Sequence, residues 1–187
     1  MNKRTIIASI VFVSLIAICV IARCLPHAPN FAPVAAAALF AGFFFKRRAL
    51  AIAVPLLGMF LSDLIVGMHD HLVMLAVYSA ILVPLAFRGW LRTKLNALRI
   101  GGGAIASALV FYLVTNFAVW MTSSMYAKTA AELGECYLVA IPFLKNTLAS
   151  NLMWSAVFFG AYAVCTRLAK STSAETTSRA GALCQTV

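Results

Sequence analysis

The chain is divided into long apolar runs that are separated by short clusters of basic residues. The first run, Ile6–Ala22, contains no charged residue. A helix needs about 20 apolar residues to cross the hydrocarbon core of a bilayer. Since lipid offers no hydrogen-bond partners, only helices and closed barrels span it. The helix-length runs therefore predict an all-α integral membrane protein.

The composition supports this prediction and excludes a soluble domain. Hydrophobic residues make up 63% of the 187 residues, and charged residues make up 11%. A soluble domain is about 45–50% apolar and about 25% charged, so this chain has too few polar residues to cover its apolar surface. The net charge of +10 could suggest a nucleic-acid partner. Here the bases flank apolar runs, as in membrane topology signals, so we expect a lipid bilayer and no nucleic acid.

We expect one transmembrane domain over residues 1–168, followed by a disordered cytoplasmic tail over residues 169–187 that is rich in Ser, Thr and Ala. About six transmembrane helices are predicted. Two of them, the second and the fourth, are short for an upright span, so five spans remain an alternative. The predicted helices are Ile6–Ala22, Val34–Phe45, Ala49–Gly67, Leu72–Phe87, Ile100–Met121 and Asn146–Leu168.

Three connecting segments have patterns of their own. Residues 23–33 contain three prolines, which exclude a regular helix. Irregular backbone at membrane depth must line a cavity or be covered by protein. Residues 88–99 are basic and amphipathic, which favours a position along the membrane surface. Cys136–Leu144 is apolar but too short to span and contains a proline, so it is predicted to be a re-entrant or surface segment.

The basic residues also predict the orientation. If the N-terminus is cytoplasmic and the helices alternate, only Arg23, Lys128 and Lys145 among the Lys and Arg residues lie outside. Cytoplasmic loops are enriched in Lys and Arg. We therefore expect both termini in the cytoplasm.

In this orientation, most of the remaining polar residues gather in the outer half of the chain. Asp63 lies in an otherwise apolar run. An ionisable residue within the membrane tends to mark a cavity, a pathway or an ion pair. Arg23 is its expected partner, and a small outward-facing pocket fits this distribution. An ion pair that only ties two helices together, with asparagines as interhelical hydrogen-bond donors, remains the structural alternative.

No catalytic or cofactor motif is recognisable. The cysteines form no Cys-x-x-Cys pair, and a disulfide between Cys24 and Cys136 stays open. His69 and His71 lack the helical spacing of zinc enzymes, so we expect neither a metal nor a cofactor, and no enzyme. An intramembrane metal enzyme using Asp63 with these two histidines is one alternative. A scaffold subunit that does not transport is another.

Five segments of the chain carry distinctive patterns. They are Arg23-x-x-Pro26-x-x-Pro29-Asn30-Phe31-x-Pro33, Ala38-Leu39-Phe40-Ala41-Gly42, Leu61-Ser62-Asp63-Leu64, Thr115-Asn116-Phe117-x-x-Trp120 and Ala140-Ile141-Pro142-Phe143-x-x-Asn146-Thr147. In these segments the chain resembles a group of small bacterial membrane proteins that are inferred to be transporters, and the resemblance covers about residues 23–163. That group is similar to the substrate-binding S components of energy-coupling factor (ECF) vitamin transporters.

The resemblance implies an S-component-like six-helix bundle in the bacterial inner membrane that imports a small nutrient such as a vitamin or corrinoid. Its partners would be a vitamin-like substrate and either an ECF coupling module with two ATPases or none, in a solitary transporter. The chain itself carries no ATPase motif. The implied substrate-binding residues are Arg23, His27, Asn30, Asp63, Asn116, Trp120, Tyr126 and Asn146.

Overall fold

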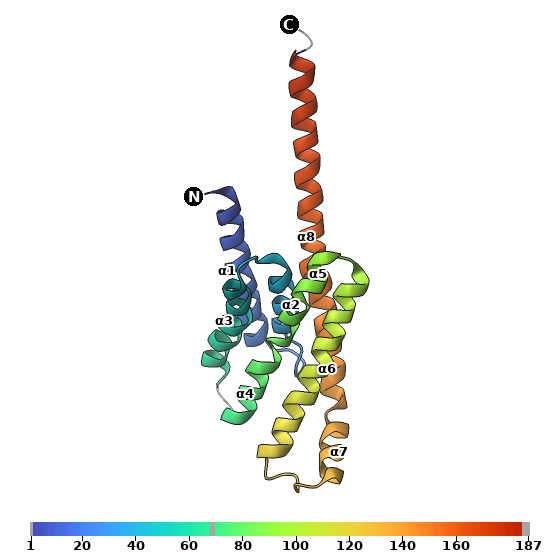
Figure 1. Ribbon diagram of the computed structural model, residues 1–187. Coiled ribbons are helices and arrows are strands. Elements are labelled where there is room, and N and C mark those ends of the chain that lie inside the picture. Colours follow the sequence, from blue (N-terminus) through green and yellow to red (C-terminus); the bar gives the residue numbers. More distant parts are fainter. Residues whose placement is uncertain (1, 68–69, 185–187) are drawn as a thin grey trace.

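The computed structural model describes residues 2–67 and 70–184, and all elements within these ranges are helices. Figure 1 shows the longer helices side by side in one bundle, with the N-terminus and the end of the last helix projecting in the same direction. The elements are α1 (Lys3–Cys24), α2 (Val34–Phe44), α3 (Arg48–Val66), α4 (His71–Ala80), the 3-10 helix η1 (Val83–Phe87), α5 (Arg88–Thr93), α6 (Ala97–Thr122), α7 (Ala130–Val139) and α8 (Ile141–Cys184).

Five helical segments are long and apolar enough to cross a membrane. They are α1, α3, α6, the segment His71–Thr93 that contains α4, η1 and α5, and the part of α8 over Ile141–Ser171. Helix α2 is also apolar but has only 11 residues. The chain is thus a multi-pass helical bundle in which the expected six helices are five long ones and one short one.

Helix α2 forms the centre of the bundle. It consists of small and apolar residues on all sides, and Val34 and every residue from Ala36 to Gly42 are buried. It packs against α3, α8, η1, α5 and α6. A helix that is hydrophobic all round is one that is buried. Phe40 contacts Phe159 of α8 edge to face, with ring centroids 5.2 Å apart.

Two arginines satisfy the last carbonyl groups of α2. The final carbonyls of a helix have no partner within the helix. Arg92 donates from Nε to the Phe43 oxygen at 2.9 Å and from Nη2 to the Phe45 oxygen at 2.5 Å, while Arg88 donates to the Lys46 oxygen at 2.9 Å. These bonds explain how a short helix can end within the bundle, and they give the predicted surface segment 88–99 a structural role.

The structure differs from the predicted elements in three places. The predicted helix Leu72–Phe87 is broken after Ala80 into α4 and η1, because Pro84 near the start of η1 supplies no N–H to continue the helix. Cys136–Leu144, which was predicted to be a re-entrant or surface segment, is helical and forms the end of α7 and the start of α8. Pro142 is tolerated there, as the second residue of α8. Helix α8 continues to Cys184, where a disordered tail was expected from residue 169.

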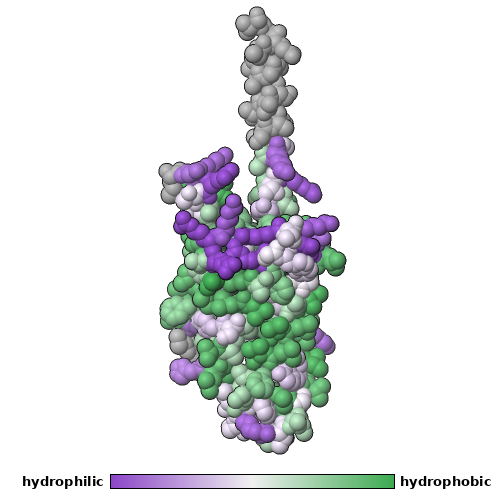
Figure 2. All heavy atoms as spheres, in the orientation of Figure 1, coloured by the Kyte–Doolittle hydropathy of each residue, from purple (hydrophilic) through white to green (hydrophobic). Residues whose placement is uncertain are grey.

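Basic residues collect at one end of the bundle. Figure 2 shows a hydrophilic band at the end from which α8 projects, next to a largely apolar middle. This is the pattern that a membrane protein needs along its length. We call this the basic end, and we call the opposite end, at the turn between α6 and α7, the far end. The basic end comprises Lys46, Arg47, Arg48, Arg88, Arg92, Lys94 and Arg99.

Helices α1 and α3 approach each other closely at Gly58. A Cβ atom at this position would lie 2.8 Å from Cys19 Cβ. Both residues are buried. This contact lies one helical turn from Arg23 of α1 and Ser62 of α3, and so it determines how near these two polar side chains come to each other.

Candidate substrate-binding site

Two adjoining cavities lie inside the bundle, in the half that is nearer the far end. Their volumes are about 210 and 340 Å³. Both are lined by Asn30, Val73, Val77 and Phe111, so they share one wall. The polar residues of the first cavity are Arg23, Asn30, Asp63, Thr147 and Asn151, and those of the second are Asn30, Thr115, Asn116, Tyr126 and Cys136.

An ion pair between α1 and α3 lines the first cavity. Arg23 Nη2 lies 2.5 Å from Asp63 Oδ1, and the two side chains are 20% and 3% exposed. This confirms the predicted pairing of Asp63 with Arg23. Arg23 Nε also donates to Ser62 Oγ at 2.6 Å. The Ser62 hydroxyl in turn lies 2.9 Å from the Gly58 oxygen and 2.8 Å from the Met59 oxygen, so its position is fixed by the turn of α3 beneath it.

Tyr78 of α4 completes this cluster. Its hydroxyl donates to Asp63 Oδ2 at 2.8 Å, so both carboxylate oxygens have a partner. Hydrogen bonds to a charged group are stronger than those between neutral groups. Tyr78 and Ser62 were not among the predicted site residues, because a serine in an apolar helix often bonds only to its own backbone and a tyrosine there can serve as packing. The signal was nevertheless present, since a buried Tyr hydroxyl normally finds a hydrogen-bond partner.

Helix α8 holds the irregular segment between α1 and α2 in place. Asn146 Nδ2 donates to the Pro29 oxygen at 3.0 Å, and Ser150 Oγ donates to the Ala32 oxygen at 2.9 Å. These two residues are four positions apart and so lie on one face of α8. Between the two anchored carbonyls, Asn30 has a φ of 61° and lines both cavities. The segment thus lines a cavity, which is one of the two positions expected for irregular backbone at membrane depth.

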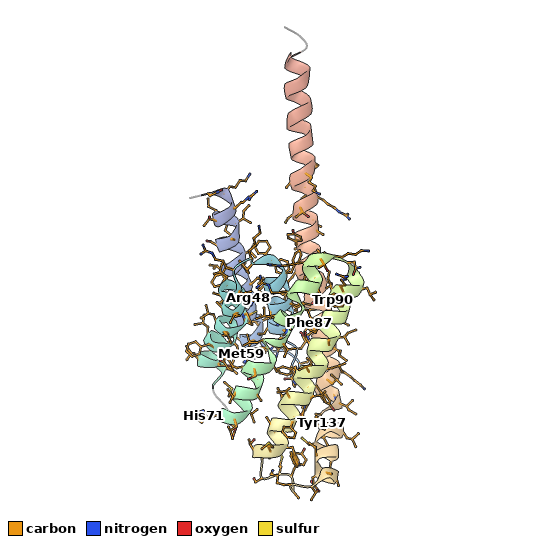
Figure 3. All side chains as sticks on the ribbon, in the orientation of Figure 1. Arg48, Met59, His71, Phe87, Trp90 and Tyr137 are labelled. Atoms are coloured by element: carbon orange, nitrogen blue, oxygen red, sulfur yellow. The ribbon has the colours of Figure 1, made fainter. Side chains whose placement is uncertain are left out.

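The second cavity is bounded by α7, which is tied to α6. Tyr112 donates to the Tyr137 carbonyl at 2.5 Å, and the Tyr137 hydroxyl donates to the Leu113 carbonyl at 2.9 Å. Figure 3 labels Tyr137 on α7, beside α6 at the far end. Burial raises the pKa of Tyr137 above its ordinary value, and its hydroxyl donates in this hydrogen bond. Tyr126, in the turn before α7, belongs to the same wall.

The structure brings together five of the eight residues expected to bind substrate. Arg23, Asn30, Asp63, Asn116 and Tyr126 line the two cavities.

The other three expected residues lie outside both cavities. His27 is exposed, and Asn146 anchors Pro29 as described above. Trp120 Nε1 donates to the Ala127 oxygen at 3.1 Å, and Lys128 Nζ lies 5.7 Å from the indole centroid. Trp120 and Asn146 thus position the chain around the site without lining it.

Residues considered for other chemistry have separate positions. Asp70 caps α4 by accepting from the backbone N–H groups of Leu72 and Val73 at 2.9 and 3.1 Å. His69 lies outside the described residues. Within residues 2–67 and 70–184, no three His, Cys, Asp or Glu side chains form a group that could hold a metal ion. Cys24 is exposed, Cys136 is buried and both are free thiols. The disulfide between them, which the sequence left undecided, is therefore not formed.

Comparison with known proteins gives a family but no activity. Residues 3–174 match the profile of a family described as "Family of unknown function (DUF6580)". No curated protein and no solved structure matches the chain.

Proposed function

The chain belongs to the DUF6580 family, whose function is unknown, and we propose that it is a substrate-binding membrane transport protein that resembles ECF S components. It imports a small nutrient such as a vitamin or a corrinoid. The two adjoining cavities bind this substrate, and the observation that carries the proposal is the position of the Arg23–Asp63 ion pair on the wall of the first cavity.

Placing charges within a membrane domain is costly, and such residues usually mark functional sites. An ion pair that served only to join two helices would not need to border a cavity. Arg23 instead keeps 20% of its side chain exposed. It also donates through Nε and Nη2, which leaves other N–H groups of the guanidinium for a ligand.

The cavity walls indicate the chemical class of the substrate. The charges of Arg23 and Asp63 cancel, so the site favours a molecule with little net charge. Much of the wall is apolar and includes Met59, Val77 and Phe111; Figure 3 labels Met59 midway along α3. Small-molecule sites commonly combine apolar walls with a few placed polar groups. The substrate is therefore a largely apolar molecule with a few hydrogen-bonding groups.

The positions of the basic end and the far end support a direction of transport. The basic end faces the cytoplasm of the bacterial inner membrane, in accordance with the positive-inside rule. The far end, with the cavities, faces outward. The substrate enters from outside, the outer turn with Tyr126 closes over it, and tilting of the whole protein releases it inward. Energy comes from an ECF module with ATPases if one binds, and otherwise the protein works alone.

The proposal can be tested by thermal unfolding of the detergent-purified protein with a panel of vitamins, corrinoids and divalent metal ions. A ligand at about 100 times its dissociation constant adds about 2.7 kcal/mol of stability. We expect a selective increase in the melting temperature with one organic class. No increase across the panel would favour a scaffold subunit, and an increase with a metal ion alone would favour the metal-enzyme alternative.

A double variant separates binding from stability. Asp63→Leu alone would leave the Arg23 charge unpaired, which costs about 3–5 kcal/mol. Replacing a buried ion pair by apolar residues of similar volume is often neutral or stabilising. We therefore expect Arg23→Met combined with Asp63→Leu to fold and to lose the ligand-induced shift. His27→Ala, at an exposed residue outside both cavities, should keep it. A wild-type shift in the double variant would refute the site.

A further inference from the structure

A groove between the start of α6 and one face of α8 is separate from the substrate cavities. Its volume is about 630 Å³. One wall includes Leu95 and Ile100, and the other includes Leu152 and Phe159, so its inner surface is mostly apolar. It shares no residue with either of the two cavities at the far end.

The groove has the length of a lipid chain. Its residues on α8 recur every three or four positions and form one stripe, which ends at Arg167. From Leu152 to Arg167 the helix rises about 22 Å, at about 1.5 Å per residue. One leaflet contributes about 15 Å to the hydrocarbon core. An acyl chain could therefore lie along the stripe with its head group at Arg167.

Two glycines keep the groove open. A Cβ atom at Gly101 or at Gly160 would meet no atom within 4 Å. The neighbouring Gly103 is different, because a Cβ there would lie 3.2 Å from Leu39, so that glycine allows two helices to approach. Glycine costs about 1 kcal/mol relative to alanine within a helix. Helix packing does not require glycine at Gly101 or Gly160, and a larger side chain at either position would project into the groove that these residues line.

The charge around the groove is positive at one end. Arg167 lines the groove and is exposed. Lys94 and Arg99 precede the groove residues Leu95 and Ile100 in the sequence, although the Arg99 guanidinium itself donates to the Trp90 oxygen and Thr93 Oγ1. The acidic residues whose side chains are described lie away from this end. They are Asp63 in α3, Asp70 at the start of α4, and Glu132 and Glu135 in α7. Basic pockets between transmembrane helices on the cytoplasmic side suit anionic lipid head groups.

We propose that this groove binds an anionic phospholipid of the leaflet at the basic end. One acyl chain lies along the apolar stripe of α8, over Gly101 and Gly160. The phosphate group lies at Arg167. This site does not depend on the proposed substrate, since the lipid and the nutrient would occupy different cavities.

The test is native mass spectrometry of the detergent-purified full chain, titrated with phosphatidylglycerol and with phosphatidylcholine that carry the same acyl chains. We expect phosphatidylglycerol to bind more tightly. Arg167→Gln should weaken phosphatidylglycerol about five-fold, which corresponds to one basic residue near an anionic surface. It should weaken phosphatidylcholine less, because the choline cation offsets the charge of the phosphate. Gly160→Leu places a larger side chain in the groove, where its Cβ atom meets no atom within 4 Å, and should weaken both lipids.

Gly134→Leu is the matched control, because Gly134 is exposed on α7 and a Cβ there also meets nothing within 4 Å. It should bind both lipids like the wild type. Equal affinity for the two lipids in the wild type would overturn the proposal. So would unchanged binding in Gly160→Leu, or a dimer of the chain that this substitution abolishes. Arg167→Gln changes an exposed side chain, so it gives an answer even if Gly160→Leu does not fold.

Discussion

At the scale of single residues, Asn30 links the backbone of the irregular segment to both cavities. Its φ of 61° lies in the left-handed region, where a Cβ atom costs about 1–2 kcal/mol and Asn is tolerated better than most residues. Its side chain borders the two cavities. Asn30 thus has two roles, one in the backbone and one in the site, which two substitutions can separate.

We expect Asn30→Ala to lower the free energy of unfolding by about 1 kcal/mol relative to Asn30→Gly, because glycine adopts this conformation without strain. Both substitutions remove the amide and should weaken substrate binding to a similar degree. Thermal unfolding with and without the ligand measures both effects. If Asn30→Gly binds like the wild type, the amide has no part in recognition. If Asn30→Ala is as stable as Asn30→Gly, the backbone argument is wrong.

Ionisable residues were easier to predict than hydroxyl residues. Asp63 and Arg23 could be paired from the sequence because each charge needs a partner in the membrane. Tyr78 could not be assigned to Asp63, because a Tyr within an apolar helix can also serve as packing or as an interface residue. Asn146 was predicted to bind substrate, but it lies outside both cavities. Its bond to the Pro29 carbonyl depends on how α8 meets a segment more than 100 positions earlier, which the sequence does not show.

At the scale of elements, the contact between α1 and α3 positions the ion pair. Gly58 lets Cys19 approach, and one turn further along α1 and α3 Arg23 donates to Ser62 and pairs with Asp63. A larger residue at Gly58 would push the helices apart because both backbones are rigid here. The ion pair would then lengthen, so the packing contact and the site are coupled.

We expect Gly58→Ala to destabilise the protein by about 1–3 kcal/mol, since its Cβ would lie 2.8 Å from that of Cys19. It should also weaken ligand binding. Gly134→Ala is the control, because its Cβ meets nothing within 4 Å and alanine is the better helix former by about 0.5–1 kcal/mol. Melting curves of the two variants should move in opposite directions. A Gly58→Ala variant as stable as the wild type would show that α1 and α3 can separate freely.

The apolar runs were sufficient to predict that each helix is present, whereas the residue at which a helix ends depends on tertiary contacts. The short α2 matched its predicted start at Val34, since Pro33 precedes it. Its burial on all sides could not be predicted, because a helix surrounded by protein and a helix surrounded by lipid have the same apolar sequence pattern. The caps from Arg88 and Arg92 were missed for a related reason. A basic cluster between two apolar runs is normally a topology signal, and only the fold shows that its arginines also reach the end of α2.

At the scale of the whole molecule, charge and cavities separate along the length of the bundle. The basic residues between α2 and α3 and between η1 and α6 lie at one end, whereas the turn before α7 borders the second cavity at the other. The alternation of the apolar runs and the distribution of Lys and Arg were sufficient to predict this separation. The cavities themselves were not predictable in shape, because their walls combine residues from α1, α2, α3, α4, α6, α7 and α8.

The proposed orientation gives the last prediction. Lys46 lies at the basic end, Ser124 lies in the turn between α6 and α7, and both are exposed. The background is a variant in which all five native cysteines are replaced. In cells whose outer envelope is permeabilised and whose inner membrane is intact, we expect Ser124→Cys to react with a membrane-impermeant maleimide. Lys46→Cys should react only after the inner membrane is opened. Because charged reagents do not cross the bilayer, the reverse pattern would put the cavities on the cytoplasmic side. The protein would then have to load its substrate from inside the cell, and nutrient import would be excluded.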